Sequence, residues 1–402
     1  MFELIFLDNL SQVTIKAPGV TYLEKGVNQS ISSLEVVFRK ELYDVGKFKS
    51  IELLVNDSLH SEWLTYTKND ILIKNEDVIS ELLDESETAV PAKMRNFRTP
   101  TITIALPKSK FSEDVINLFA YLPLSNTKFK LPFLVNADFI PDLDRTDIIH
   151  NLKYNNEVLR LLAVALQEFA QELALDNDLE RLNSLLPDFK LEYLSSAEII
   201  VESLFKLLPN TNLNIDNIKV PLSNITVDKT GFLSNIGKDT FIELIDGENV
   251  PINTLGDFAR IEKLIEGINP DAIFNFSKLK KKVNQYHFEN WLKIESNNLK
   301  FIKYLNTLGQ LEFFQDEAIF LSDDLNLYKG NELYVDLGID SDTLVWLNYK
   351  RVLNRSILIE LIDVLLPLKK YDPIIFINEV ICGEKRDFIV ECLHNEVISF
   401  DE

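Results

Sequence analysis

Glycine, cysteine and histidine are scarce in this chain of 402 residues, which holds 12 glycines, two cysteines and four histidines. Few glycines argue against a phosphate-binding loop, and the sequence has neither a Walker lysine loop nor GxGxxG after an expected strand. The histidines (His60, His150, His287 and His394) do not stand in HExxH or another metal-ligand spacing. The GxSxG motif of the α/β-hydrolases is missing too. The sequence therefore offers none of these common catalytic motifs.

Cysteine usage and apolar runs bear on the compartment. Cys382 and Cys392 are spaced for neither a zinc knuckle nor a redox pair. A secreted chain of this size more often carries a disulfide framework, so a reducing cytoplasm is favoured. The richest apolar run, 357–368, is interrupted by Glu360 and Asp363 and is shorter than the roughly 18 residues of a membrane span. The first ten residues have no basic region ahead of their apolar residues, so a cytoplasmic protein without a signal peptide is expected.

Positive charge is outnumbered as well. The chain has 63 Asp and Glu against 41 Lys and Arg, which gives a net charge of −22. Such a surface repels phosphate backbones and anionic lipids, so neither nucleic acid nor a membrane is expected as a partner. A basic run at 278–282 (KLKKK) is typical of a solvated helix face. Hydrophobic residues make up 46% of the chain and include 26 phenylalanines, enough to build a large core.

The order of apolar residues predicts a mixed α/β (α+β) protein. Short β-branched or aromatic segments predict strands, and apolar residues at helical spacing predict helices. The expected strands are 3–7, 12–16, 20–24, 51–55, 62–67, 101–106, 117–122 and 133–138. The expected helices are 78–83, 155–175, 197–208, 258–265, 288–308 and 356–366, with a loop over 85–100 and a β-hairpin over 310–322.

The length suits two or three domains. The polar triplet at 176–178 interrupts the helical pattern, so a domain boundary is predicted after residue 175. This gives a first domain over 1–175 and a helix-rich C-terminal region over 176–402, which divides near residue 250 if it holds two subdomains.

One segment, LPFLVNADFIPDLDRTDIIH at 131–150, has an order of residue types that suggests a mechanism. Asp144 suits a helix N-cap and Asp147 falls at the third helical position, so Arg145 is expected in the first turn of a helix. Two alternatives are open. Asp142, Asp144 and Asp147 lie close enough in sequence to bind a divalent cation, although the glycine and terminal glutamate of a calcium loop are missing. Arg145 also has a simple alternative, a local ion pair with Asp142 or Asp147.

This segment resembles part of the sacsin-like and related ATP-binding proteins, relatives of the large heat-shock chaperones in the superfamily named for gyrase, histidine kinase and MutL. In these families an S5-like α/β middle domain follows the nucleotide-binding domain. It carries an apolar strand, Asn-Ala-Asp/Asn-Phe, a turn and an arginine. The matching residues are Asn136, Ala137, Asp138, Phe139 and Arg145, preceded by a similar strand at 118–123. The resemblance covers about residues 1–175 and extends more weakly over 176–402.

The resemblance implies a role for Arg145, because the corresponding arginine of the chaperones reaches the γ-phosphate of ATP held by another domain. A guanidinium suits this role since it stays charged and can fork onto phosphate oxygens. The residues expected to support the site are Asn136, Asp138, Phe139, Asp144 and Asp147. The ExxxN helix, DxGxG pocket and glycine-rich lid of these ATPases are not found in the sequence. The chain alone is therefore expected to hydrolyse no ATP and to bind no metal, with ATP and Mg implied on a separate nucleotide domain.

Three functions are compatible with the sequence. The first is a non-catalytic segment that couples the nucleotide state of an ATPase domain, in cis or in trans, to a protein client or partner, with a homodimer formed through the larger protein. The second is a nucleotide-independent interaction scaffold, which suits an acidic, Phe-rich α/β protein. The third is an independent enzyme whose site is assembled from distant carboxylates, although the spacing of the acidic residues selects no pair.

Overall fold

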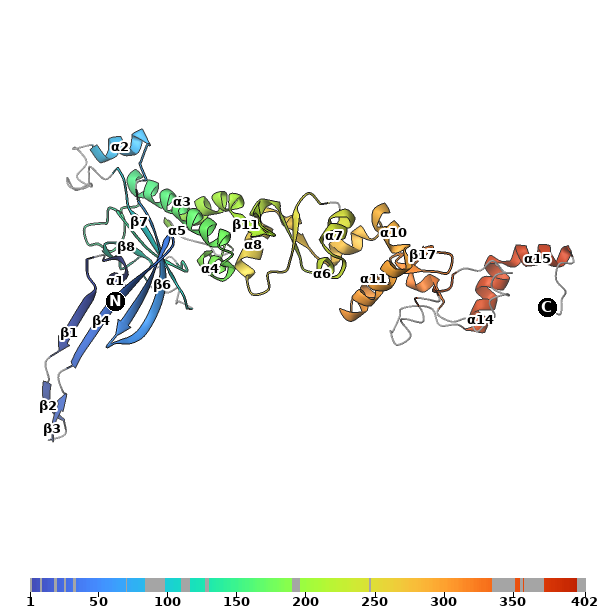
Figure 1. Cartoon of the computed structure of the whole chain (residues 1–402), viewed down its shortest axis with the longest axis horizontal. Helices are drawn as coiled ribbons and strands as arrows, with labels where there is room; N and C mark the ends of the chain where they lie inside the picture. The colour runs from blue at the N-terminus through green and yellow to red at the C-terminus, as the bar shows by residue number, and fades with distance from the viewer. Residues whose placement is uncertain are drawn as a thin grey trace. The chain divides into compact units, whose positions relative to one another are not determined.

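The computed structural model describes residues 2–7, 9–17, 20–24, 27–31, 34–69, 71–83, 98–109, 116–126, 130–189, 196–245, 247–334, 351–354, 357 and 372–395. The chain forms two compact units (Figure 1). The first comprises Met1–Ile225 and Leu255–Ala272, and the second comprises Thr226–Thr254 and Ile273–Glu402. The predicted domain boundary after residue 175 falls inside the first unit. It stays a prediction, as does the division near residue 250.

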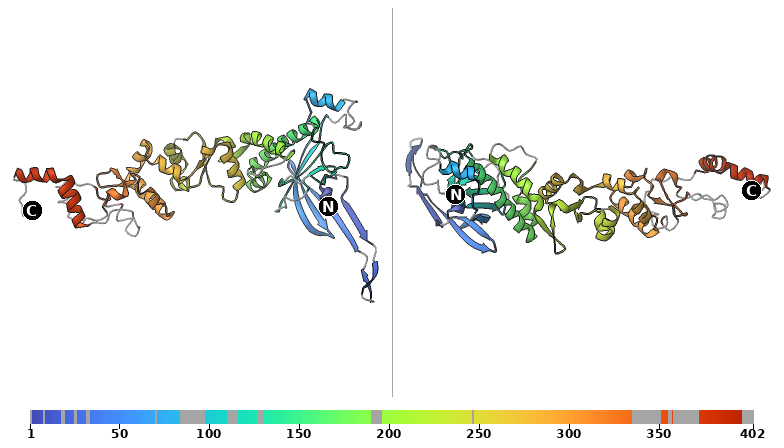
Figure 2. Two further views of the ribbon diagram at one scale, coloured as in Figure 1. Left: turned by 180° about the vertical axis from the view of Figure 1, so that it is seen from behind. Right: turned by 90° about the horizontal axis from the view of Figure 1, so that it is seen from above.

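The first unit is built on an eight-stranded mixed sheet with the order β1-β4-β5-β6-β7-β10-β8-β9. Neighbouring strands are antiparallel except β10 and β8, which run parallel. The strands are β1 (Gln12–Ala17), β4 (Leu34–Val45), β5 (Phe48–Val55), β6 (Ser58–Lys68), β7 (Ile102–Pro107), β8 (Leu118–Ala120), β9 (Leu122–Pro123) and β10 (Leu134–Ala137). A hairpin of β2 (Val20–Glu24) and β3 (Val27–Ile31) extends beyond the ends of β1 and β4 (Figure 2).

The two faces of this sheet bury different partners, because side chains alternate along each strand. Ile51 and Trp63 lie in one cluster with the apolar residues of α1 (Glu3–Phe6). On the opposite face, Phe48 and Tyr66 contact Phe169 of α3 (Lys153–Leu175), and the Tyr66 and Phe169 rings stack with centroids 5.4 Å apart. The long helix α3 thus covers the sheet beside the segment that sequence analysis singled out.

The remaining elements of the first unit pack against α3 or against one another. They are α2 (Glu76–Leu83), α4 (Leu179–Leu185), α5 (Ser196–Leu207), α8 (Ala259–Ile268), the hairpin of β11 (Asn212–Ile215) and β12 (Ile218–Pro221), and the turns η2 (Leu208–Asn210), η3 (Leu222–Asn224) and η4 (Pro270–Ala272). The apolar face of α3 is fully buried. Arg260 of α8 donates to the carbonyl of Leu186, just after α4, at 2.8 Å. The helix α8 therefore belongs to this unit although a segment of the other unit precedes it.

The second unit has a small sheet of order β14-β13-β15 and a core of aromatic rings. Its elements are β13 (Ile225–Asp228), α6 (Phe232–Ile236), α7 (Lys238–Ile245), β14 (Val250–Asn253), β15 (Ile273–Phe274), α9 (Phe276–Lys282), α10 (Tyr286–Leu292), α11 (Glu295–Thr307), η5 (Glu312–Phe314), β16 (Phe320–Leu321), β17 (Leu327–Tyr328), η6 (Gly330–Glu332), α14 (Pro373–Phe376), the π-helix η7 (Ile377–Glu384) and α15 (Arg386–His394). Phe232 is buried at the centre. The rings in contact with it are Phe241, Phe288, Trp291, Phe301 and Tyr304.

The predicted mixed α/β class is confirmed, and most predicted elements lie where expected. The strand expected over 3–7 is wrong: it is the helix α1, and a short apolar run does not distinguish the two by pattern alone. The helix expected over 288–308 is broken into α10 and α11, and the side chains of Asn297 and Asn298 donate to carbonyls at the end of α10. The hairpin expected over 310–322 is also wrong, since β16 pairs with β17 instead.

Two predicted segments fall mostly on residues that are not described, the loop over 85–100 and the helix over 356–366. The basic run 278–282 does form the end of a helix, α9, with Lys281 exposed. Within the described ranges, no helix combines the length and the apolar character needed to cross a membrane.

Candidate functional site

The segment 131–150 includes β10, and three of its polar side chains contact the tight turn between β8 and β9. Tyr121 occupies this turn with φ +64°. Its N–H donates to Oδ1 of Asn136 at 2.8 Å, and its hydroxyl donates to Oδ1 of Asp138 at 2.7 Å. The other carboxylate oxygen of Asp138 accepts from the N–H of Thr101 at 2.8 Å. Asn136 and Asp138 therefore hold this turn in its left-handed conformation.

Asp138 accepts hydrogen bonds from the hydroxyl groups of two tyrosines, Tyr121 and Tyr154. The hydrogen bond to its carboxylate, together with burial, raises the pKa of Tyr121 to about 12. Tyr154 donates to the backbone carbonyl of Asp138 at 3.0 Å, and burial raises the pKa of Tyr154 well above its ordinary value. Phe139, the residue after Asp138, is 1% exposed and lies in the core. The end of β10 is thus held by the hydrogen bonds of Asp138 and by the burial of Phe139.

Arg145 is not in a helix, which corrects the sequence-based prediction. It is exposed in a turn with φ +53°, and its N–H donates to the carbonyl of Asp142 at 3.1 Å. One guanidinium nitrogen, Nη2, donates to the carbonyl of Ala120 at 2.6 Å, next to the Tyr121 turn. The expected N-cap at Asp144 is wrong too, because α3 begins only at Lys153 and Asp144 is an exposed turn residue.

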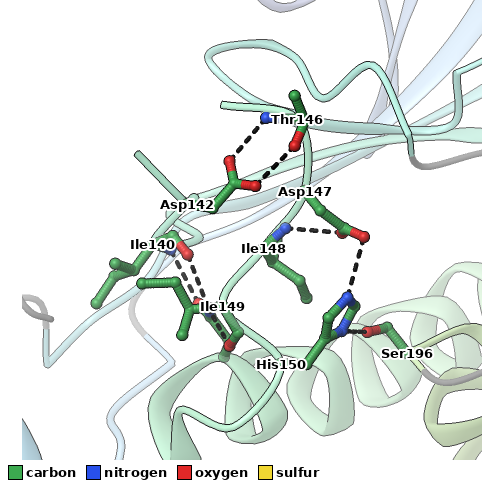
Figure 3. A network of polar contacts seen from close by, with 9 residues as sticks. Ile140, Asp142, Thr146, Asp147, Ile148, Ile149, His150 and Ser196 are labelled. Carbon is green, nitrogen blue, oxygen red and sulfur yellow. Dashed lines mark hydrogen bonds and ion pairs between the residues drawn. The ribbon is translucent and has the colours of Figure 1, made fainter. Parts of the chain in front are cut away.

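The turn that carries Arg145 is closed by side-chain hydrogen bonds. The carboxylate of Asp142 accepts from the N–H and the hydroxyl of Thr146, both at 2.7 Å (Figure 3). These bonds, the hydroxyl of Thr146 first, hold the pKa of Asp142 below its usual range despite some opposing desolvation. Asp142 also donates its N–H to the carbonyl of Asp147 at 2.9 Å, which ties the two ends of the turn together. Leu143 and Arg145 project from the closed loop, and both are exposed.

The alternative of a local ion pair is not seen. Among the described residues, Arg145 forms no salt bridge with Asp142 or Asp147 within 4.0 Å. Asp142 is engaged with Thr146, and Asp147 accepts from the N–H of Ile148 at 2.7 Å and contacts His150. The guanidinium therefore keeps donors that no carboxylate of the turn occupies.

A buried asparagine that sequence analysis missed forms hydrogen bonds with the backbone before and after the Arg145 turn. Asn155, in the first turn of α3, is fully buried. Its Oδ1 accepts from the N–H of Ile140 at 2.9 Å, and its Nδ2 donates to the carbonyls of Ile140 and Ile149 at 2.8 and 3.0 Å. The signal was a polar residue at helical spacing from the buried Val158 and Leu162. Such a residue on an apolar face is buried only if its polar atoms are satisfied.

A chain of three polar side chains joins the turn to α5. Nε2 of His150 lies 3.0 Å from Oδ2 of Asp147, and Nδ1 lies 2.9 Å from Oγ of Ser196 (Figure 3). The residue types match those of a catalytic triad. Ser196 is 2% exposed, however, so its hydroxyl is out of reach of a substrate. The chain of contacts anchors the turn to the first residue of α5.

The predicted polar and charged site residues thus fall into three groups. Asn136, Asp138 and Arg145 converge on residues 120–121, Asp147 belongs to the network with His150, and Asp144 stays at the exposed tip of the turn. Within the described residues, no three His, Cys, Asp or Glu side chains are grouped to hold a metal ion, the three aspartates at 142–147 included. Chemically, the arrangement presents an anchored guanidinium to solvent.

Comparison with protein-family models, with curated proteins and with solved structures found no match for this chain.

Proposed function

We propose that this chain is a coupling segment of a chaperone-like ATPase, linking the nucleotide state of a separate ATPase domain to the binding of a protein partner or client. Arg145 contacts the γ-phosphate of ATP held by that domain, and the first unit acts as the S5-like middle domain. The observation that supports this most is the mounting of Arg145 on a closed turn, with Nη2 tied to Ala120. The assembly is cytoplasmic and forms a homodimer through the larger protein.

The geometry supports the chemistry in two ways. A guanidinium carries five N–H donors, and the bond to Ala120 orients the group while other donors remain for phosphate oxygens. A preorganised cation at a phosphate stabilises the charge that develops during phosphoryl transfer, because it needs no reorganisation at the moment of reaction. Arg145 also senses whether the γ-phosphate is present, so that phosphate sensing and domain closure occur together.

The test is ATP turnover by the assembly of this chain with its ATPase domain. Arg145→Lys keeps the charge but loses the fork, so we expect kcat to fall about 100-fold or more. The matched control is Arg160→Lys on α3, where an exposed arginine pairs with Glu157 at 3.3 Å and turnover should be unchanged. The isolated chain should show no turnover. Full activity of the Arg145→Lys assembly would rule out the proposed contact.

An interaction scaffold that uses no nucleotide is the second candidate. The tip of the Arg145 turn also carries Leu143, which is as exposed as a free side chain, at 103%. An exposed leucine and an exposed arginine on one closed turn suit a contact with an acidic, partly apolar protein surface. This function is favoured if an assembly that contains the chain binds its partner equally well with and without ATP.

A further inference from the structure

The first strand of the large sheet, β1, lies at an edge of that sheet. It is the outermost strand of the order β1-β4-β5-β6-β7-β10-β8-β9, so β4 pairs with one side of it and no described strand pairs with the other (Figure 1). Natural proteins usually protect such an edge with a proline, a bulge or a covering element. The register between β1 and β4 is continuous over Gln12–Ala17, and this segment contains no proline. β1 therefore keeps the regular backbone that a further strand needs for pairing.

The direction of the backbone groups in β1 follows from its pairing with β4. The N–H of Lys40 donates to the carbonyl of Ser11 at 2.8 Å, so these two opposite residues are a hydrogen-bonded pair. In an antiparallel ladder such pairs alternate with pairs that share no hydrogen bond. Every second residue from Ser11 onward therefore directs its N–H and C=O groups to β4. The residues between them, Gln12, Thr14 and Lys16, direct these groups away from the sheet.

The residue opposite Thr14 supports this alternation. Thr14 lies opposite Val37 of β4, and both backbone groups of Val37 bond to Asn56, which follows β5 on the other side of β4. The N–H of Val37 donates to Oδ1 of Asn56 at 2.9 Å, and its carbonyl accepts from the N–H of Asn56 at 2.8 Å. Since Val37 directs its backbone groups to this side, the N–H and the carbonyl of Thr14 point out of the sheet edge.

The side chains of β1 form a polar set and an apolar set, because successive residues of a strand point to opposite faces. On one face, Nε2 of Gln12 donates to Oγ1 of Thr14 at 3.3 Å, and Lys16 forms a salt bridge with a glutamate of β4 at 3.2 Å. On the other face, Val13 packs against the apolar cluster around α1, and Ile15 is 56% exposed. Ile15 thus leaves apolar surface uncovered beside Val13.

We propose that two copies of this chain pair through their β1 edges, antiparallel and centred on Thr14. A two-fold axis at Thr14 brings together residues that are equally far from it in the two strands. Thr14 then lies opposite the partner's Thr14, and Gln12 lies opposite the partner's Lys16. All three outward-facing residues find a partner, and each of these pairs exchanges two backbone hydrogen bonds. On the other face, Val13 lies opposite the partner's Ile15.

The sequence of β1 is complementary to itself in this register. The apolar pair of Val13 and Ile15 extends the cluster around α1, and the polar face sets an uncharged amide opposite a lysine, so like charges do not meet. A register centred one residue to either side would leave one of the outward-facing residues opposite a residue beyond the partner's strand. β1 has one lysine and no acidic residue, although the chain carries a net charge of −22. Two acidic copies can therefore approach each other at this edge with little repulsion.

Sedimentation equilibrium of the full chain tests the pairing. We expect a monomer–dimer equilibrium with a Kd of about 100 µM or tighter, since a strand edge is smaller than a standard interface. Thr14→Pro removes one outward N–H from each copy and should raise the Kd at least about tenfold. Edge strands accept a proline whose N–H is outside the ladder, so the circular dichroism spectrum should stay that of the wild type. Thr14→Val keeps the N–H and the branched shape and should change the Kd less than about threefold.

Disulfide cross-linking tests the register independently of the affinity. The background is Cys382→Ser, which removes the exposed native cysteine. In it, Thr14→Cys should form covalent dimers with the oxidant diamide, because the Cα atoms of a hydrogen-bonded pair lie about 5.5 Å apart, a distance that a disulfide spans. Gln12→Cys is the matched control. Its two introduced cysteines are offset by roughly 13 Å along the strands and should stay reduced.

Three results would overturn the proposal. The first is a full chain that stays monomeric at about 300 µM. The second is a Thr14→Pro variant that dimerises as the wild type does. The third is equal cross-linking of Thr14→Cys and Gln12→Cys, which would show random collision. The inference uses neither Arg145 nor ATP and concerns the chain itself, so its failure would leave the coupling function to be decided by ATP turnover.

Discussion

The Arg145 turn of the first unit and the helix α6 of the second unit satisfy their polar side chains to different degrees. In the turn, Asp142 accepts two bonds from Thr146, and Arg145 itself is tied to Ala120. In α6, the carboxamide oxygen of Asn235 is buried and has no hydrogen-bond partner among the described residues. The turn is therefore organised by its own hydrogen bonds, whereas α6 leaves one buried acceptor unsatisfied.

The largest expected effect comes from removing the buried hydrogen bonds that support the Arg145 turn. Asn155→Leu fills a similar volume but leaves the N–H of Ile140 and the carbonyls of Ile140 and Ile149 without their buried partner. We expect the free energy of opening of this segment to fall by about 3 kcal/mol, the cost of unsatisfied buried groups. Hydrogen exchange measured by mass spectrometry on peptides from 131–155 gives this value, with peptides from α11 as an internal reference.

The control is the neighbouring residue. Asn156→Leu changes a half-buried asparagine whose side chain has no hydrogen bond in the described structure, so protection of 131–155 should stay within about 0.5 kcal/mol of the wild type. Equal loss of protection in the two variants would mean that Asn155 acts by bulk and not by its hydrogen bonds.

A second prediction tests whether the charge of Asp142 closes the turn. The pKa of Asp142 is lowered by its bonds to Thr146, so the folded turn favours the ionised carboxylate. This contribution is present above the unfolded pKa of about 4 and is lost as the pH falls through the lower folded value. We expect the amide of Thr146, followed by NMR, to lose protection as the pH is lowered below about 4. In Asp142→Asn this pH dependence should disappear, and protection at pH 7 should be lower.

Asp144→Asn provides the matched control, because Asp144 lies two residues away and is exposed. It should leave both the protection of Thr146 and its pH dependence unchanged. A loss in Asp144→Asn as large as in Asp142→Asn would assign the effect to the overall charge of the loop. The hydrogen bonds of Asp142 would then not explain how the Arg145 turn is closed.

These residues also show what could be predicted from the sequence. The helix α3 and several strands of the large sheet were predicted because helical spacing and alternation are repeated along them, whereas its longest strand, β4, was not predicted. The conformation at Arg145 was not, since an aspartate before a polar run caps a turn as readily as a helix, and here Asp142 caps a turn that ends before α3 begins. The contact of His150 with Ser196 joins residues 46 positions apart, and no local pattern encodes it.

The smallest effect concerns the hydrogen bond between Tyr121 and Asp138, which lies at the edge of the organised site. The pKa of Tyr121 is raised to about 12, so the folded state favours the neutral phenol. Its contribution is present below the unfolded value of about 10 and is lost as the pH rises through about 12. In a phenolate absorbance titration, Tyr121→Phe should remove one ionisation near pH 12 and leave the steps near 10 in place. Loss of a step near 10 instead would show that Asp138 does not hold the hydroxyl. Asn136 would then be the main polar support of the turn to which Arg145 is tied.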